Sequence, residues 1–541
     1  MKKSILLLFA ALLPLVANAH DFEFDGIYYN ITSEEAKTAE VTYKGDNPYK
    51  GGWYSGSITI PATVTYDGVA YSVTSIGEKA FYKCSSLTAI TIPEGVTSIG
   101  SGAFYGCSSL TAIVVAEGNK VYDSRGGCNA IIETASNTLI LGCSTTIIPE
   151  SVTSIGEGAF FSCRGLTDIT LPESSQLTSI GYIAFSGCSS LTAITLPEGV
   201  TSIGNWAFWG CSSLTAITLP EGVTSIGERA FERCSRLTSI TIPESVTRIG
   251  EGAFDGCNSL TDIIVAEGNA VYDSRGGCNA IIETSSNILI TGCSATIIPK
   301  GVTSIGDDAF SECSSLTAIN IPEGVTSIGS YAFSSCSSLT AIIIPEGVKS
   351  IGSNAFYNCR YIESIVLPNG LETIDFSAFA FCPNLEEVYC YAENIPSAKP
   401  NAFDGSNLKH AVLHVPDGSI DSYKAASPWS KFSNMMTDNE EAESQKAVIG
   451  VQGTFDLNGR SITGEGLPRP NITTQAEGRV VVTITVNPEG EVVATSINLR
   501  TNTSDPELRK VAEEAAKRAR FNKTNGVDNQ MGAITYYFRK L

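Results

Sequence analysis

The hydrophobic positions of this chain follow one pattern that repeats over much of its length. In the unit that begins at Cys84, the apolar residues Leu87, Ile90 and Ile92 are separated by polar or small ones, which predicts a short strand with one buried face. A Pro-Glu-Gly turn follows this strand. An Ala-Phe pair then refills the core shortly before Cys107, where the unit begins again.

The unit recurs in register along the chain. An Ile-Gly-x-x-Ala-Phe signature occurs in eleven copies between Ile76 and Phe379, the last with Asp375 in place of glycine. A longer segment, VYDSRGGCNAIIET, stands at 121–134 and again at 271–284. Cysteines lie 23 residues apart within three runs: Cys84 and Cys107; Cys188, Cys211, Cys234 and Cys257; and Cys313, Cys336, Cys359 and Cys382.

A fixed period in this range is typical of a leucine-rich repeat solenoid. One unit cannot bury its own apolar face, so neighbouring units must stack on one another. We therefore expect a solenoid with a short β-strand and an irregular return in each coil, in the form of a long, curved rod.

The repeated units resemble the BspA-type leucine-rich repeat family, whose pattern is C-x-x-L-x-x-I-x-[IL]-P-x-x-[VL]-x-x-I-G-x-x-A-F. The resemblance covers about residues 60 to 410, and it is specific because the pattern repeats in register. It implies a bacterial surface or secreted protein that acts in binding and adhesion. The periodicity by itself predicts only the solenoid.

The N-terminus reads as an export signal. Residues 1–19 have two lysines before an apolar run and end in Ala-Asn-Ala, as a cleavable secretory signal peptide does. The alternative of an uncleaved anchor is disfavoured. A membrane span needs about 20 apolar residues, and the run here is shorter and contains Pro14. We expect an exported protein, in the periplasm, at the cell surface or secreted from a bacterium.

The repeat region has distinct segments at both ends. Residues 20–75 lack the period but contain an Asp67-Gly68 hairpin turn, so we expect a β cap on the first coil. The solenoid and its C-terminal cap extend over 76–432, where we expect a last strand, a short helix and Trp429 over the core. Residues 433–452 lose the pattern and carry several acidic residues, which predicts a linker.

The sixteen cysteines raise the question of disulfides, because an exported protein ordinarily oxidises them. Stacked strands lie about 4.8 Å apart, within reach of a disulfide, but equivalent side chains run parallel and each has two equal neighbours. We favour free thiols that fill the core. No Cys-x-x-Cys or Cys-x-x-His pair occurs, and His410 and His414 have no cysteine near them in sequence, so we expect neither a metal site nor a cofactor.

Variation among the units is concentrated around the Ala-Phe pair. The outward positions of the strand are nearly uniform, as in Thr192-Ala193-x-Thr195, and suit a ladder that stabilises the sheet. Aromatic residues flank Ala-Phe in several coils and would form a ridge able to bind a protein or a glycan. The alternative is that these rings pack over neighbouring turns. The candidates are Trp206 and Trp209, which we rank first, and Tyr82, Tyr105, Phe161, Tyr182, Tyr331 and Tyr357.

The last hundred residues form a different domain. From Ala447 onward there is no cysteine, and twelve basic residues stand against ten acidic ones, whereas the whole chain carries a net charge of -21. RVVVTITVNPEGEVVATSINL predicts two paired strands, and a helix that Ser504 or Asp505 caps follows, with one apolar face. A final strand is expected at Gly532 to Phe538.

This β-β-α-β pattern resembles the C-terminal domain of TonB, a periplasmic energy transducer, over residues 453–541. The resemblance rests on Gly478, Val480, Val482, Val486, Gly490, Val492, Arg518, Phe521 and the Tyr536-Tyr537-Phe538 end. It implies that the last strand receives a peptide of an outer-membrane transporter by strand addition. That docking edge would comprise Ile534, Thr535, Tyr536, Tyr537, Phe538 and Arg539. A transducer also needs a membrane anchor, and the chain offers only a cleavable signal, so a binding module is favoured.

No catalytic pattern is present in the sequence, and we expect no enzymatic activity. The acidic charge disfavours nucleic acid and anionic lipid as partners, and no segment after the signal is long enough to span a membrane. We expect an exported protein-interaction or adhesion protein, with a solenoid for a host or envelope target and a C-terminal module for an envelope component. The alternative is an accessory of TonB-dependent outer-membrane transport.

Overall fold

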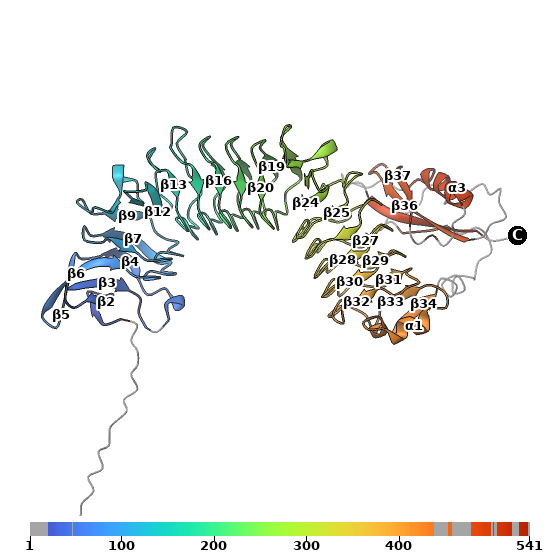
Figure 1. The fold of residues 1–541 in the computed structure, drawn as a ribbon, viewed down its shortest axis with the longest axis horizontal. Helices are drawn as coiled ribbons and strands as arrows, with labels where there is room; N and C mark the ends of the chain where they lie inside the picture. Colours follow the sequence, from blue (N-terminus) through green and yellow to red (C-terminus); the bar gives the residue numbers. More distant parts are fainter. Residues whose placement is uncertain are drawn as a thin grey trace, which may run out of the picture. The chain divides into compact units, whose positions relative to one another are not determined.

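The computed structural model describes residues 20–45, 47–437, 453–456, 478–498, 501, 506–521 and 530–538. The expected signal peptide, the helix cap at Ser504 or Asp505, and Arg539 lie outside them. The chain divides into two compact units, Met1–Leu237 with Arg248–Ala253 and Thr238–Thr247 with Phe254–Leu541, and each is described by itself. The architecture is a β-solenoid of leucine-rich repeat type, with few helices (Figure 1).

The first unit begins with a mixed sheet that leads into the first coil. Its elements are β1 (Phe22–Phe24), β2 (Ile27–Ser33), β3 (Thr38–Thr42), η1 (Pro48–Lys50), β5 (Thr63–Tyr66), β6 (Val69–Ile76) and β8 (Ser98–Ile99). Asp67 and Gly68, with φ of 49° and 77°, form the expected hairpin turn between β5 and β6. Strand β6 also pairs in parallel with β8, so this sheet and the first coil share a strand.

The coils of the first unit carry short strands on more than one face, and most of them pair in parallel. One sheet comprises β10 (Tyr122–Asp123), β11 (Ile131–Glu133), β12 (Thr138–Leu141), β13 (Ser154–Ile155), β14 (Ser179–Ile180), β16 (Ser202–Ile203), β18 (Ser225–Ile226) and β20 (Arg248–Ile249). The other strands are β4 (Ser55–Thr59), β7 (Ser86–Ile92), β9 (Ala112–Val115), β15 (Ala193–Thr195) and β17 (Ala216–Thr218), and η2 spans Arg125–Gly127. Ile155 pairs with Ile180, and Ile180 with Ile203, so one repeat makes one coil.

The second unit repeats this arrangement. One sheet comprises β22 (Tyr272–Asp273), β23 (Ala280–Glu283), β24 (Ile288–Gly292), β25 (Ser304–Ile305), β26 (Ser327–Ile328), β28 (Ser350–Ile351), β30 (Thr373–Ile374) and β32 (Ser397–Ala398). The others are β19 (Ser239–Ile242) with β21 (Asp262–Val265), and β27 (Ala341–Ile343), β29 (Ser364–Leu367), β31 (Glu387–Cys390), β33 (Val412–Val415) and β34 (Asn434–Thr437). η3 spans Arg275–Gly277.

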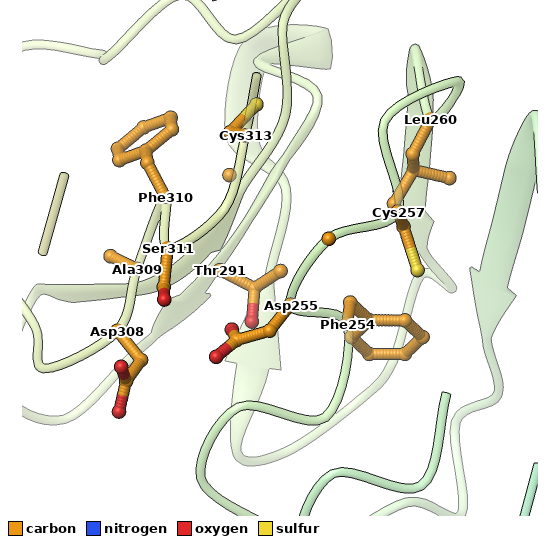
Figure 2. Close-up of a pocket in the computed structure, with 12 residues that line it drawn as sticks. Phe254, Asp255, Cys257, Leu260, Thr291, Asp308, Ala309, Phe310, Ser311 and Cys313 are labelled. Carbon is orange, nitrogen blue, oxygen red and sulfur yellow. The ribbon is translucent and has the colours of Figure 1, made fainter. Parts of the chain in front are cut away.

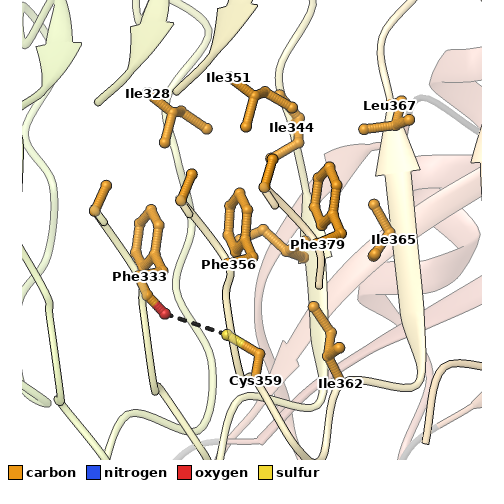
Figure 3. Packing of buried hydrophobic residues seen from close by; sticks show 14 of the residues in the cluster. Ile328, Phe333, Ile344, Ile351, Phe356, Cys359, Ile362, Ile365, Leu367 and Phe379 are labelled. Carbon is orange, nitrogen blue, oxygen red and sulfur yellow. Dashed lines mark hydrogen bonds between the residues drawn. The ribbon is translucent and has the colours of Figure 1, made fainter. Parts of the chain in front are cut away.

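A column of stacked phenylalanine rings forms the centre of each core. Successive rings from the Ala-Phe pairs lie nearly parallel, for example Phe333 on Phe356 at 5.1 Å between centroids and Phe356 on Phe379 at 5.1 Å (Figure 3). Isoleucines and leucines of the strands pack beside them, as Ile344 and Ile351 do. Each coil has the same interior volume to fill, so each repeat supplies one phenylalanine ring at the equivalent position of its coil.

The cysteines are free and buried, and most have a second role besides filling space. The thiol of Cys359 donates a hydrogen bond to the backbone oxygen of Phe333 in the preceding coil, at 3.2 Å (Figure 3). The same bond recurs from Cys107, Cys188, Cys211, Cys234, Cys336 and Cys382. The Phe333 oxygen also accepts from the backbone N–H of Cys336, so the thiol adds a second hydrogen bond to this carbonyl and links adjacent coils.

The C-terminal cap of the solenoid closes the core and adds a strand. Helix α1 (Ile420–Ala425) and η4 (Trp429–Lys431) follow β33, and the fully buried Trp429 donates through Nε1 to the oxygen of Pro396, as the expected covering role requires. Residues 434–437, expected to begin a linker, instead form β34, which pairs with β33. Met435 explains the difference, because its side chain packs against the core.

The C-terminal region has the expected strands and helix, with one further strand. Its elements are β35 (Gly453–Asp456), β36 (Gly478–Val486), β37 (Val492–Ile497), α3 (Pro506–Lys517) and β38 (Gln530–Phe538). Val480, Val482, Ile484 and Val486 are buried against the apolar face of the helix, as their alternation predicts. The sheet order is β35-β38-β36-β37, so β38 lies between two strands.

The expected docking edge at Ile534 to Arg539 is corrected by this order. β35 pairs with β38 from Ala533 to Tyr536, and β36 pairs with its other side. The stretch from Ala533 to Tyr536 is thus paired on both sides, and a peptide added there would have to displace β35. Sequence reasoning missed β35 because its four residues carry little alternation.

Candidate functional site

The variable residues around each Ala-Phe pair lie on tight loops with left-handed backbone. Both the residue before Ala and the second residue after Phe have positive φ, as at Trp206 (52°) and Gly210 (68°). This conformation favours glycine and is uncommon for a bulky side chain. The residues before Ala are Lys79, Gly102, Gly158, Ile183, Trp206, Arg229, Gly252, Asp308, Tyr331, Asn354 and Ser377. The recurrent glycines were the sequence signal for these loops.

Trp206 and Tyr182 form an aromatic pair across adjacent coils of the first unit. Their ring centroids lie 5.7 Å apart at an interplanar angle of 86°. Tyr182 is 45% exposed, and Trp206 is half-buried. The backbone N–H of Trp206 donates to the oxygen of Glu228 in the next coil, which fixes the loop that carries the indole.

Trp209 lies beside a cluster of charged residues. The guanidinium carbon of Arg233 is 5.9 Å from the Trp209 ring, a cation–π distance. Glu232 is buried, and its carboxylate lies 3.7 Å from Arg229 and 3.6 Å from Arg233. Arg229 also lies 3.8 Å from Glu228. The structure thus brings Trp206 and Trp209 into one surface that Tyr182 and these charged residues share.

The other aromatic candidates occur in separate pairs. Tyr105 lies 4.9 Å from Phe161 and donates from its hydroxyl to Glu157 at 2.8 Å. Burial, followed by the hydrogen bond to Glu157, raises the pKa of Tyr105 well above its usual value. Tyr82 contacts Tyr49 at 6.1 Å, Tyr357 contacts Phe381 at 5.3 Å, and Tyr331 is 45% exposed. The structure therefore shows local aromatic groups, and each is a separate candidate.

The second unit has a small cavity where the first has an aromatic pair. Asp255 and Ser311 stand 150 residues after Tyr105 and Phe161, and they line a cavity of about 10 Å³ with Thr291 and Asp308 (Figure 2). In the first unit, Gly158 leaves room for the tyrosine, since a Cβ there would lie 2.3 Å from its ring. This cavity has space for one water molecule and no more.

The uniform outward face of the strands changes character in the last coils. Thr195 and Thr218 pair across β15 and β17 and are exposed, as the strand-ladder interpretation predicts. In the sheet from β27 to β34 the same outward position is occupied by Ile343, Val366, Tyr389, His414 and Met436, paired in register. His414 stacks on Tyr389 at 4.2 Å and contacts Glu387 through Nε2. The sequence prediction did not include this ladder. Its signal was the presence of apolar residues at both the inward and the outward positions of these strands.

The described residues contain no group of three His, Cys, Asp or Glu side chains arranged to hold a metal ion. Within the same residues, no helix is long and apolar enough to cross a bilayer. Burial raises the pKa of the Cys211 thiol to about 12 and that of the Cys390 thiol to about 11. These two thiols are poor nucleophiles at neutral pH, so we assign them a structural role in the core.

Replacement of Trp206 by glycine separates the two interpretations of the aromatic residues. If the indole is a surface group, Trp206→Gly should change the free energy of unfolding by less than about 1 kcal/mol, because relief of the left-handed backbone offsets the lost ring contact. Gly102 and Gly158 occupy the same position in sister coils. Urea unfolding measures the change, and a loss above about 2 kcal/mol would show that the ring belongs to the core.

Comparison with known proteins agrees with the repeat architecture. The family described as BspA type Leucine rich repeat region matches residues 56–125, 140–267 and 290–410, more than half of the chain. The C-terminal domain lies outside this match, and no curated protein matches the chain.

Several solved structures are similar. A leucine rich cell surface protein from Faecalibacterium prausnitzii is 31% identical, over 68% of this chain and 93% of its own, with a TM-score of 0.43. A leucine-rich repeat protein from Bacteroides ovatus is 29% identical, over 70% and 99%, with a TM-score of 0.38. The pneumococcal vaccine antigen PcpA is 20% identical, over 77% and 98%, with a TM-score of 0.41. On its sequence match, the chain belongs to the BspA-type leucine-rich repeat family.

Proposed function

We propose that this chain is an exported protein-interaction or adhesion protein whose solenoid recognises an extracellular or envelope target. The observation that carries the proposal is the surface of Tyr182, Trp206 and Trp209. Large aromatic side chains with a neighbouring arginine are typical of the residues that dominate binding energy. They stand on loops that vary, while the rest of the coil is nearly constant. The family, whose members are typically surface or exported proteins, and the cell-surface relative from Faecalibacterium support this role.

The experiment uses the intact protein on beads and envelope or host-surface extracts. We expect capture that saturates and that free protein competes away. A variant with Trp206→Gly and Trp209→Ser should lose at least nine-tenths of it, while Thr195→Val with Thr218→Val should retain it. The double tryptophan variant uses residues that sister coils carry, such as Gly158 and Ser186. Equal capture by both variants would contradict the proposal.

A second role is proposed for the C-terminal domain, as a module that holds an envelope component. It is supported by the position of β37 at the edge of the sheet formed by the described strands, where Val493 is 52% exposed. Strand addition would use this edge, since β38 is paired on both sides from Ala533 to Tyr536. The related transport accessory role requires that the intact protein bind peptides of outer-membrane transporters. Binding that Val493→Lys abolishes would support it, and absence of any peptide binding would rule it out.

A further inference from the structure

The surface around Trp206 combines the exposed ring of Tyr182 and the half-buried rings of Trp206 and Trp209 with a rim that has no net charge. We define the coil-five patch as Tyr182, Trp206 and Trp209 with Asn205, Glu228, Arg229, Glu232 and Arg233. The arginine side chains are 41% and 51% exposed, and that of Glu228 is 43% exposed. All of these residues belong to the first unit. The patch is therefore a local feature of three successive coils.

The loop that carries Trp206 is held in place by the neighbouring coil. Trp206 has the left-handed backbone (φ 52°) that the residue before Ala has in every coil, so this conformation belongs to the repeat. The loop is fixed by two backbone hydrogen bonds, from Trp206 to Glu228 at 2.9 Å and from Trp209 to Trp206 at 3.1 Å. A fixed ring loses little conformational entropy on binding, which favours a ligand that stacks on it.

The rim identifies the class of ligand. Two arginines stand against two glutamates within ion-pair distance, so the patch offers no surplus charge to a charged peptide. It does offer both donors and acceptors, including the exposed side chain of Asn205, whose Oδ1 accepts from the Glu228 N–H at 3.0 Å. A polyhydroxylated, uncharged ligand needs this mixture, since each hydroxyl both donates and accepts.

We propose that the coil-five patch binds a neutral glycan, with pyranose C–H faces on the rings of Tyr182, Trp206 and Trp209 and hydroxyls on the polar rim. The negative face of an aromatic ring attracts polarised C–H groups, so stacking and rim hydrogen bonds act together. This inference rests on the proposed function, in that the solenoid recognises a target through this surface, and it adds the chemistry of that target.

The test is affinity electrophoresis of the intact protein in gels that contain galactomannan, mannan, xyloglucan or glycogen. We expect at least one polysaccharide to retard the protein, with the apparent affinity lowered at least tenfold by Trp206→Gly with Trp209→Ser. Thr195→Val with Thr218→Val is the matched control and should be retarded like the parent. Quenching of tryptophan fluorescence by acrylamide should decrease when the polysaccharide is added. Unchanged circular dichroism and urea midpoint show that the variants are folded.

Three results would overturn the inference. The first is that none of the four polysaccharides retards the protein. The second is retardation that the tryptophan variant retains in full. The third is tighter binding to an acidic random copolymer of glutamate and tyrosine, which would assign the patch to acidic peptides. In each case the bead capture described above still decides the proposed function, because it detects protein targets as well.

Discussion

Phe208→Ala should lower the free energy of unfolding by about 3 to 5 kcal/mol, the range for truncation of a buried phenylalanine. Phe208 is fully buried and stacks between Phe185 and Phe231, with centroids 5.3 Å away on each side. Removal of the ring leaves a cavity, and the coil cannot collapse into it because its backbone is bonded to both neighbours. In a solenoid each coil contacts only its neighbours, so the loss should uncouple the coils on either side.

Urea unfolding followed by far-UV circular dichroism measures this loss. The parent should unfold with a steeper transition than Phe208→Ala, because uncoupled segments unfold separately. Thr218→Ala, at an exposed outward position, should change the stability by less than about 0.5 kcal/mol. A loss below about 1 kcal/mol for Phe208→Ala would contradict the stacked core.

Alkaline pH should destabilise the protein steeply. Burial raises the pKa of Cys211 and Cys382 in the folded state from 9.0 to about 12, and it raises that of Cys336 and Cys359 well above 9.0. The unfolded chain therefore releases these protons at lower pH than the folded chain does. Stability is fully present below about pH 9 and is lost as the pH rises toward 12, by about 1.4 kcal/mol per pH unit for each such thiol.

Urea unfolding under reducing conditions at pH 7.5, 9 and 10 tests this dependence. We expect the midpoint to fall between pH 9 and pH 10 by more than it falls between pH 7.5 and pH 9. In parallel, a thiol reagent at pH 7.5 should modify almost none of the sixteen cysteines in the folded protein and all of them in guanidinium. Rapid reaction of the folded protein, or a midpoint independent of pH, would contradict the buried free thiols.

The strands and the core of the solenoid were predictable because their residues repeat. Leu87, Ile90 and Ile92 are all buried, as their spacing implies. The Asp67-Gly68 turn and the buried face of Val480 to Val486 followed from local patterns for the same reason. In each instance the signal lies within about ten residues, and over such a short range the sequence pattern predicts the backbone conformation and which side chains are buried.

Features that depend on contacts across coils were not predictable from one sequence. The hydrogen bond from Cys359 to Phe333 joins residues that are far apart in the chain. Strand β35 is likewise defined by its pairing with β38, which is distant in the sequence. The sequence identified the set of aromatic candidates, but it did not predict which of them contact one another. Tyr182 contacts Trp206 from a different position of its own loop, so equivalence in the repeat did not predict that pair.

The most direct test of the account is hydroxyl-radical footprinting of the intact protein, alone and with its captured target bound. If the loops that flank Ala-Phe carry recognition, oxidation of Tyr182, Trp206 and Trp209 should fall several-fold in the complex. Oxidation at the outward threonines Thr195 and Thr218, assigned residue by residue, should be unchanged. Protection of these threonines, with the three aromatic residues oxidised as in the free protein, would contradict it.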